Sequence, residues 1–270
     1  MIKGDNILNV GTSAGGGVSI IANDPVASGG GGGGDAPPIT TDLLVYYNPD
    51  VEAYSDAGTT LAADGDNVRQ FNDQSGNANT LSQSAASLQP FYDIGTLGAG
   101  LGSIKITSTD HLDTTNALTF EQPDANFTFY LVYKKGALGI SHYVVGQMAP
   151  LVGNSRIWLR NAYYQAYDTN NQNAFVSTTD STDIIILAIT INTSGSATEQ
   201  RYKVYKNGSF LASTTRDFGG AFRFNNLYGV GWSSISGDFY GGNMLFYNGV
   251  HDATQVQEVS DWLNTKYSIY

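Results

Sequence analysis

The segment RYKVYKNGSFLAS (Arg201–Ser213) decides the fold class, because it has the pattern of two short β-strands joined by a tight turn. Tyr202, Val204 and Phe210 alternate with polar residues, which is the period of a strand with one buried face. Asn207-Gly208 stands between the two halves and suits a type I′ turn, in which both central residues have positive φ. We therefore expect an antiparallel β-hairpin here.

Similar strand signals recur through the rest of the chain after residue 39. The run IIILAITIN (Ile184–Asn192) is apolar almost throughout and predicts a central strand covered on both faces. No helical pattern alternates with the strands, which favours an all-β, antiparallel sandwich over a βαβ fold. The other short apolar or aromatic runs are LLVYY (Leu43–Tyr47), FTFYLVYKK (Phe127–Lys135), NLYGVGW (Asn226–Trp232) and NMLFYN (Asn243–Asn248).

One helix is expected, at the end of the chain. Asp252 is a favourable N-cap, and Gln255 follows it at the spacing of a capping box. Apolar residues then recur at helical spacing, which predicts that the helix packs against the sandwich. This stripe consists of Val256, Val259, Leu263 and Tyr267, with Trp262 beside it.

Three segments together resemble the laminin-G-like and concanavalin A-like lectin/glucanase family. Residues of about 40–270 are covered, and the resemblance implies a jelly-roll β-sandwich with a closing helix. Phe71 stands where this family often carries Trp, a conservative change for a core position. The segments are VRQFNDQSGNAN (Val68–Asn79), KVYKNGSFLAST (Lys203–Thr214) and GGNMLFYNGVHDATQVQEVSDWLNTKY (Gly241–Tyr267).

The residues before the sandwich have a different composition. Eleven of the 32 glycines lie in the first 34 residues, six of them consecutively at Gly29–Gly34, which is typical of a flexible linker. We expect an arm at 1–28, a Gly/Pro-rich linker at 29–38 and the jelly roll at 39–270. The arm is either a disordered tail or an anchor that orders on docking. Its apolar anchor candidates are Ile7, Leu8, Val10, Val18, Ile20 and Ile21.

Jelly rolls that carry a Gly-rich arm are similar to bacteriophage virion proteins such as fibres, spikes and capsid decoration proteins. This resemblance implies that the arm attaches to other virion proteins and that the chain lies on the surface of the capsid or tail. It also implies a homo-oligomer, with a trimer favoured for fibres, and a head that contacts glycans of the host surface. All of these implications rest on analogy with the context in which similar domains occur.

Charge and composition exclude several classes of partner. With 13 basic and 24 acidic residues the net charge is −11, which argues against binding of nucleic acid. There are no cysteines for disulfides or thiolate metal sites. The longest apolar run, Ile184–Ile191, is far shorter than the roughly 20 residues of a membrane span, so we expect no membrane insertion. The opening residues lack the apolar region of a secretory signal, so export by the general secretory route is not expected.

The acidic residues give little indication of catalysis. Twenty are Asp, a turn former, and the four Glu are 69, 78 and 59 positions apart. No two Glu can therefore share one strand, as the glucanases of the resembled family require. We expect a protein that is not an enzyme. A glycan-degrading enzyme on the same scaffold and a cellular lectin-like adhesion module are the alternatives.

A calcium ion is the only cofactor that the sequence suggests. The loop ADGDNV (Ala63–Val68) offers Asp64, Asp66 and Asn67, and oxygen ligands of this kind suit calcium. The alternative is a β-turn in which Gly65 takes the positive φ.

Aromatic residues beside amides and carboxylates mark two candidate carbohydrate sites, because flat rings stack on sugars and polar groups bind hydroxyls. Strand alternation would instead bury about half of these rings in the core. Tyr163 and Tyr164 cannot both face inward on one strand, so one of the two should be exposed. The first site comprises Trp158, Tyr163, Tyr164, Tyr167 and Asn171, and the second Trp232, Asp238 and Tyr240.

Overall fold

The computed structural model describes residues 36–107, 109–147, 155–194, 201–229 and 237–270. Residue contacts divide the chain into one unit at 1–30 and a second at 31–270. The anchor candidates, the linker glycines Gly29–Gly34 and Trp232 lie outside the described residues. The boundaries at 28 and 38 therefore stay predictions.

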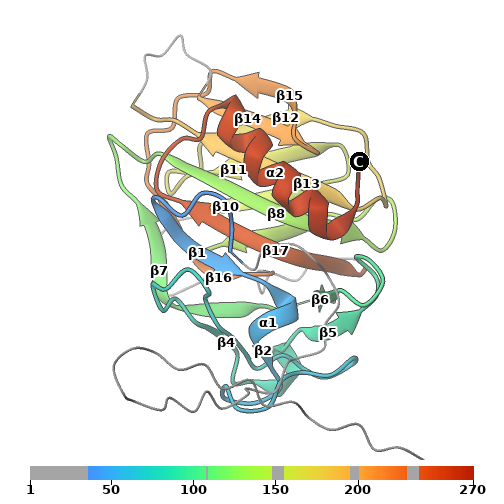
Figure 1. The fold of residues 1–270 in the computed structure, drawn as a ribbon. Helices are drawn as coiled ribbons and strands as arrows, with labels where there is room; N and C mark the ends of the chain where they lie inside the picture. The colour runs from blue at the N-terminus through green and yellow to red at the C-terminus, as the bar shows by residue number, and fades with distance from the viewer. Residues whose placement is uncertain (1–35, 108, 148–154, 195–200, 230–236) are drawn as a thin grey trace, which may run out of the picture. The chain divides into compact units, whose positions relative to one another are not determined.

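Two antiparallel sheets form the second unit, as the sequence predicted (Figure 1). Among the described residues, sheet A has eight strands and sheet B nine. Sheet A contains β1 (Leu43–Tyr47), β5 (Phe91–Ile94), β6 (Gly102–Ile106), β8 (Phe127–Lys135), β13 (Ile185–Ile191), β14 (Tyr202–Lys206), β15 (Ser209–Thr214) and β17 (Phe239–Tyr247). Sheet B contains β2 (Ala53–Tyr54), β3 (Gln70–Phe71), β4 (Leu81–Ser82), β7 (Leu112–Phe120), β9 (His142–Gly146), β10 (Arg156–Arg160), β11 (Tyr163–Tyr167), β12 (Asn173–Ser177) and β16 (Phe222–Leu227).

The strand order shows that sequence neighbours often lie apart. Sheet A runs β15-β14-β13-β8-β17-β6-β5, and sheet B runs β12-β11-β10-β9-β16-β7-β4-β3-β2. The first and last strands of sheet A meet, because β1 pairs with Met244–Tyr247 of β17 while β6 pairs with Phe239–Gly241. Because strands from the two ends of the described chain pair in one sheet, the sandwich depends on contacts between residues far apart in the sequence.

Alternate residues of β13 enter two separate apolar layers. Ile185, Leu187 and Ile189 lie in the core between the sheets, whereas Ile186 and Ala188 pack in a second core on the outer side of sheet A. All seven residues of the strand are buried. The prediction of a strand covered on both faces is confirmed.

The predicted hairpin joins β14 to β15. Asn207 has φ 52° and Gly208 φ 74°, the positive pair that a type I′ turn requires. The Asn207 side chain also accepts a hydrogen bond from the Ile186 backbone N–H at 2.9 Å. Phe210 is 55% exposed, in contrast to the buried Tyr202, because β15 is the edge strand of sheet A.

Helix α2 (Ala253–Tyr267) provides the outer layer of sheet A (Figure 1). Asp252 accepts a hydrogen bond from the Gln255 N–H, and the Gln255 side chain accepts one from the Asp252 N–H, so the predicted capping box is present. The predicted apolar stripe of α2 is buried against Tyr130, Val132 and other outward side chains of sheet A. Two short turns complete the helical elements of the described residues, α1 (Pro49–Glu52) and the 3₁₀ helix η1 (Ala86–Leu88). None of the described helices is long and apolar enough to cross a membrane.

The turn after β3 has a structural role that its sequence suggested only by resemblance. Asp73 accepts a hydrogen bond from the Tyr46 N–H at 2.9 Å, and Gln74 accepts one from the Asn48 N–H at 2.7 Å. The Asn79 side chain donates to the Leu44 carbonyl at 3.1 Å. These bonds occupy the edge of β1 that does not face β17, which prevents that edge from pairing with other chains.

Candidate functional site

The outer face of sheet B carries a continuous row of side chains, one from each strand. On every strand of this sheet apolar residues face the core, so the intervening residues face outward. Nine of these residues, one from each strand, form an unbroken series across the sheet, in which each is the cross-strand partner of the next. This polar row consists of Tyr54, Gln70, Ser82, Asp113, Asn226, Gly146, Arg156, Tyr167 and Asn173.

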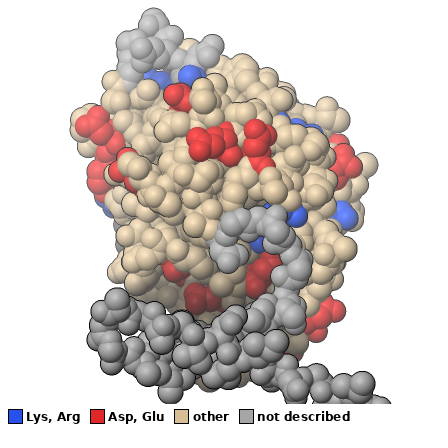
Figure 2. All heavy atoms as spheres, viewed as in Figure 1, with Lys and Arg blue, Asp and Glu red and all other residues tan. Residues whose placement is uncertain are grey.

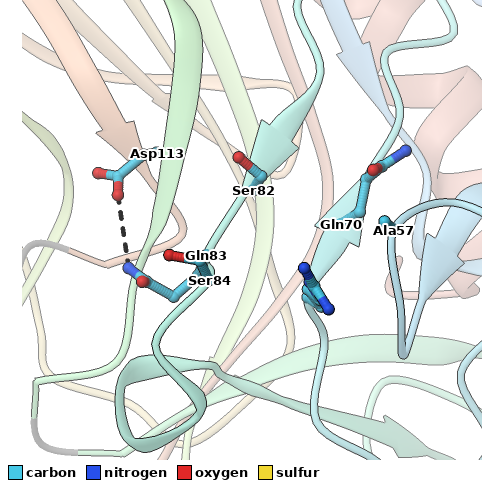
Figure 3. A pocket seen from close by; sticks show the side chains of 7 residues that line it. Ala57, Gln70, Ser82, Gln83, Ser84 and Asp113 are labelled. Atoms are coloured by element: carbon cyan, nitrogen blue, oxygen red, sulfur yellow. Dashed lines mark hydrogen bonds between the residues drawn. The ribbon is translucent and has the colours of Figure 1, made fainter.

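A recess of about 240 Å³ opens at one end of the polar row (Figure 3). Its volume is below the roughly 300–1,000 Å³ of pockets that enclose a whole small ligand. It therefore suits one unit of a longer ligand that lies along the face. The recess is lined by Ala57, Arg69, Gln70, Ser82, Gln83, Ser84 and Asp113, of which Asp113 is the only carboxylate.

Buried amides and a histidine hold Asp113 in place. Its Oδ1 accepts a hydrogen bond from the Asn226 amide. Its Oδ2 accepts one from the Gln83 amide at 3.4 Å, the bond that is dashed in Figure 3. His111 Nδ1 lies 2.9 Å from the Thr109 carbonyl, so Nδ1 carries the proton and Nε2 accepts from Gln83 at 3.0 Å. Burial raises the pKa of the Asp113 carboxyl above its ordinary value, and His111 partly opposes this shift.

Asp110, which also flanks His111 in the sequence, does not reach the recess. Its Oδ2 accepts hydrogen bonds from the N–H and the hydroxyl of Thr107, at 2.9 and 2.8 Å. Asp110 therefore closes a turn, and the two carboxylates do not act on one site.

The other end of the polar row is an aromatic patch on β9 to β12. A five-residue turn between β11 and β12 sets the register of this hairpin, and Asp168 is its buried centre. The two carboxylate oxygens of Asp168 accept hydrogen bonds from the Gln172 and Gly220 N–H groups at 2.8 and 2.7 Å. The aromatic patch comprises the rings of Tyr143, Trp158, Tyr163, Tyr167 and Phe175 with the guanidinium groups of Arg156 and Arg160.

The guanidinium groups cover two of the predicted stacking rings. Tyr143 stacks on Trp158 at 4.5 Å, and the Arg160 guanidinium carbon lies 4.3 Å from the Trp158 ring centre. Both groups therefore lie against the Trp158 ring. The Arg156 guanidinium lies 3.6 Å over the Tyr167 ring. Trp158 and Tyr167 thus position arginines, and neither offers two free faces to a sugar.

Tyr163 and Phe175 are the rings of the patch that remain open to solvent. Tyr163 is 40% exposed and Phe175 53% exposed, and they contact each other edge to face at 5.5 Å. Asn171 is exposed in the adjacent turn, where its side-chain oxygen accepts a hydrogen bond from Arg156 at 3.4 Å.

Tyr164 has to be removed from the predicted site. It is 1% exposed in the core between the sheets, and its hydroxyl lies 2.9 Å from the Tyr133 hydroxyl. Alternation along β11 turns Tyr163 outward and Tyr164 inward, which leaves one of the two rings exposed as expected.

The second predicted patch does not join the first. Asp238 forms a salt bridge with Lys105 at 3.0 Å, and the Tyr240 hydroxyl donates to Asp238 at 3.3 Å. Tyr240 lies on β17 of sheet A and packs against the α2 core, so it belongs to the opposite side of the sandwich. Trp232 lies outside the described residues.

The loop proposed for calcium is built as a turn in this structure. Asp64 accepts a hydrogen bond from the Ile94 N–H at 2.9 Å, Asp66 accepts one from the Ala63 N–H at 2.9 Å, and Gly65 has φ 83°. Asn67 forms an isolated β-bridge with Phe91. Within the described residues no group of three or more His, Asp or Glu side chains is arranged to hold a metal ion. Calcium binding at this loop stays a prediction.

Sequence reasoning missed Phe175, Tyr143 and the two arginines of the patch. Phe175 could have been predicted from the hairpin register. A turn at residues 168–172 places Phe175 opposite Gln165, on the outward side of β12. No local signal indicated Tyr143, whose position beside Trp158 depends on the pairing of β9 with β10 across a bulge.

Comparisons with known proteins place this fold among toxin binding domains. No family model matches the chain, and no curated protein matches its sequence. The binding domain of Paraclostridial Mosquitocidal Protein 1 superposes with a TM-score of 0.57 at 13% identity, over 81% of this chain and 52% of that one. The ligand binding domain of botulinum neurotoxin serotype D, solved in complex with N-acetylneuraminic acid, gives 0.55 at 12% identity, over 83% and 51%. The type G receptor binding domain gives 0.51 at 13% identity, over 82% and 51%.

The chain thus spans about half the length of these toxin domains. At identities of 12–13% the likeness concerns the fold alone. It supports the jelly-roll part of the expectation, and the lectin/glucanase family remains a resemblance. The chain shares the β-sandwich fold of domains that are described as binding domains.

Proposed function

We propose that the outer face of sheet B binds carbohydrate and that the protein is a binding head without catalytic activity. The observation that carries this proposal is the polar row, which links the recess at Asp113 to the exposed rings of Tyr163 and Phe175. With strands about 4.8 Å apart, the row extends about 38 Å across nine strands. The accessible side chains at its two ends suit separate units of an oligosaccharide or polysaccharide chain.

The two ends of the row would make different contacts with such a chain. The Tyr163 and Phe175 rings stack on the apolar C–H faces of sugar rings. At the other end, Asp113, Gln70 and Ser82 bind hydroxyls, because a carboxylate accepts hydrogen bonds while amides and hydroxyls both donate and accept. The middle of the row does not reach solvent, because Asn226 and Gly146 are buried.

The recess favours binding over hydrolysis. A glycosidase needs two carboxyl groups about 5–9.5 Å apart on either side of the scissile bond. Asp113 is the one carboxylate among the described lining residues. The toxin domains that share the fold are likewise described as binding domains.

We further propose that this head belongs to a bacteriophage virion, as a fibre, spike or decoration protein that contacts a glycan of the host surface. Residues 1–28 would anchor it to other virion proteins on the capsid or tail, and the protein would be a homo-oligomer, with a trimer favoured. These proposals rest on the sequence resemblance and on the composition of the arm. They fail if deletion of residues 1–34 leaves incorporation into the particle intact.

Glycan binding is tested on an array of bacterial-surface and host polysaccharides, followed by affinity measurements with variants. We expect Tyr163→Ala and Phe175→Ala each to weaken binding about two- to tenfold, the range of one aromatic contact. Phe210→Ala is the matched control, because Phe210 is 55% exposed on the edge of sheet A. The proposal is wrong if no polysaccharide binds, or if Phe210→Ala weakens binding while the two sheet B variants do not.

A further inference from the structure

The two arginines of the aromatic patch are held in fixed orientations. Arg160 lies over the Trp158 ring at 4.3 Å, and Arg156 lies over Tyr167 at 3.6 Å and within 5.7 Å of Tyr143. Stacking fixes the plane of a guanidinium group, and its N–H donors point outward from the edge of that plane. Such an arginine loses little side-chain freedom when it binds a planar anion.

Among the described residues, no carboxylate forms a salt bridge with Arg160. The side chain of Arg160 is exposed. The acidic residue of the adjacent turn, Asp168, is fully buried with both oxygens bonded to backbone N–H groups. Arg69, which lines the recess at the other end of the polar row, also has no salt bridge among the described residues.

The arginine-bearing end of this face, on β10, contrasts with the acidic composition of the chain. The net charge is −11, and Figure 2 shows carboxylates distributed over the side of the molecule that carries α2. An anionic ligand would therefore be repelled by much of the surface and attracted to the arginine-bearing face of sheet B.

We infer that the ligand of sheet B is an acidic polysaccharide and that Arg160 binds one of its carboxylate groups. This inference rests on the carbohydrate binding proposed above. A guanidinium group matches a carboxylate with two parallel hydrogen bonds, a geometry that a neutral hydroxyl does not offer.

The experiment compares each acidic polysaccharide with its own carboxyl-reduced form, which keeps the sugar backbone and loses the charge. The probes are polygalacturonate, alginate and hyaluronan, together with the acidic members of the polysaccharide array. We expect the acidic form to bind about tenfold or more tightly than the reduced form, with the preference decreasing as salt is added.

Variants assign this preference to Arg160. Arg160→Gln should lose most of the preference for the acidic form, because affinity for the acidic form falls more than affinity for the reduced form. Arg160→Lys should keep part of it, because lysine retains the charge without the planar fork. Lys206→Gln, on β14 of sheet A, is the charge-matched control and should change neither. The ratio of the two affinities is measured within each variant, so partial unfolding does not alter it.

The outcomes separate this inference from the function on which it rests. Equal binding of acidic and reduced forms, or binding of neutral glycans alone, overturns the inference and leaves carbohydrate binding intact. A preference that survives in Arg160→Gln overturns the assignment to this arginine. Absence of binding to every glycan on the array overturns carbohydrate binding and this inference together.

Discussion

The outer faces of the two sheets differ in what lies on them. On sheet A the outward side chains are apolar, and α2 packs on them to form a second core. On sheet B the outward side chains are polar or aromatic, and several of them are open to solvent. The two faces come from the same kind of antiparallel pairing, so the difference lies in the side chains.

The sequences of the strands differ in the same way as the two outer faces. Every residue of β13 in sheet A is buried, whereas β10 in sheet B alternates between buried and outward positions. A strand with two apolar faces requires a cover on each, which α2 supplies for sheet A. Sheet B can leave its outer face in water, and that freedom is what makes the face suitable for binding a ligand.

Removal of apolar contacts from the covered face should have the largest effect. Leu263 of α2 is fully buried in the outer core of sheet A. We expect Leu263→Ala to lower the free energy of unfolding by about 3 kcal/mol, the usual cost of such a cavity. Urea unfolding followed by circular dichroism measures this. Glu258→Ala, an exposed position on the same helix, should change it by about 0.5 kcal/mol or less. Equal effects at the two positions would mean that α2 does not cover sheet A.

A smaller effect should follow from acid, through the inner face of sheet B. Burial, and next the charge of Lys135, lower the pKa of His142 to about 3, against about 6.5 in an unfolded chain. Below pH 6.5 the unfolded state binds a proton that the folded state does not, so stability is complete above that pH and falls toward pH 3. Between pH 6.5 and 5 this loss should be about 2 kcal/mol.

The control for the acid effect is His142→Phe, which keeps an aromatic ring against Phe239. His251 has a pKa lowered to about 4 by burial and acts in the same direction, so the difference between wild type and variant isolates His142. Parallel pH profiles of unfolding for the two proteins would contradict the assignment.

The smallest effect on stability is expected on the outer face of sheet B. Phe175 is 53% exposed, so Phe175→Ala should lower the free energy of unfolding by about 0.5 kcal/mol or less. The same urea titration measures it, with Phe210→Ala as the matched exposed position on sheet A. A loss as large as that of Leu263→Ala would show that another part of the protein covers the face, and would remove it as a ligand site.

Several elements were predictable because a local pattern specifies them. Asn207 and Gly208 readily adopt the positive φ angles of a type I′ turn, and Asp252 with Gln255 forms the capping box of α2. The apolar run of β13 predicted a cover on both faces, because apolar residues on both sides of a strand have to be buried. For the candidate site, alternation alone required that one of Tyr163 and Tyr164 be exposed.

The rest of the site could not be read from local pattern. Gln70, Asp113 and Asn226 are far apart in the sequence and meet because β3, β4, β7 and β16 are neighbours in one register. The pairing of β9 with β10 likewise decided that Trp158 lies against both Arg160 and Tyr143.

The sequence by itself determined which strands bury one face and which bury two, because side-chain alternation along a strand is a local property of the backbone. It also determined the turns and the closing helix, whose dihedral angles and caps depend on neighbouring residues. Only the tertiary structure decided that polar residues from nine strands form one row ending in the aromatic patch. Strand order and register are set by long-range packing of the core, and no short segment contains that information.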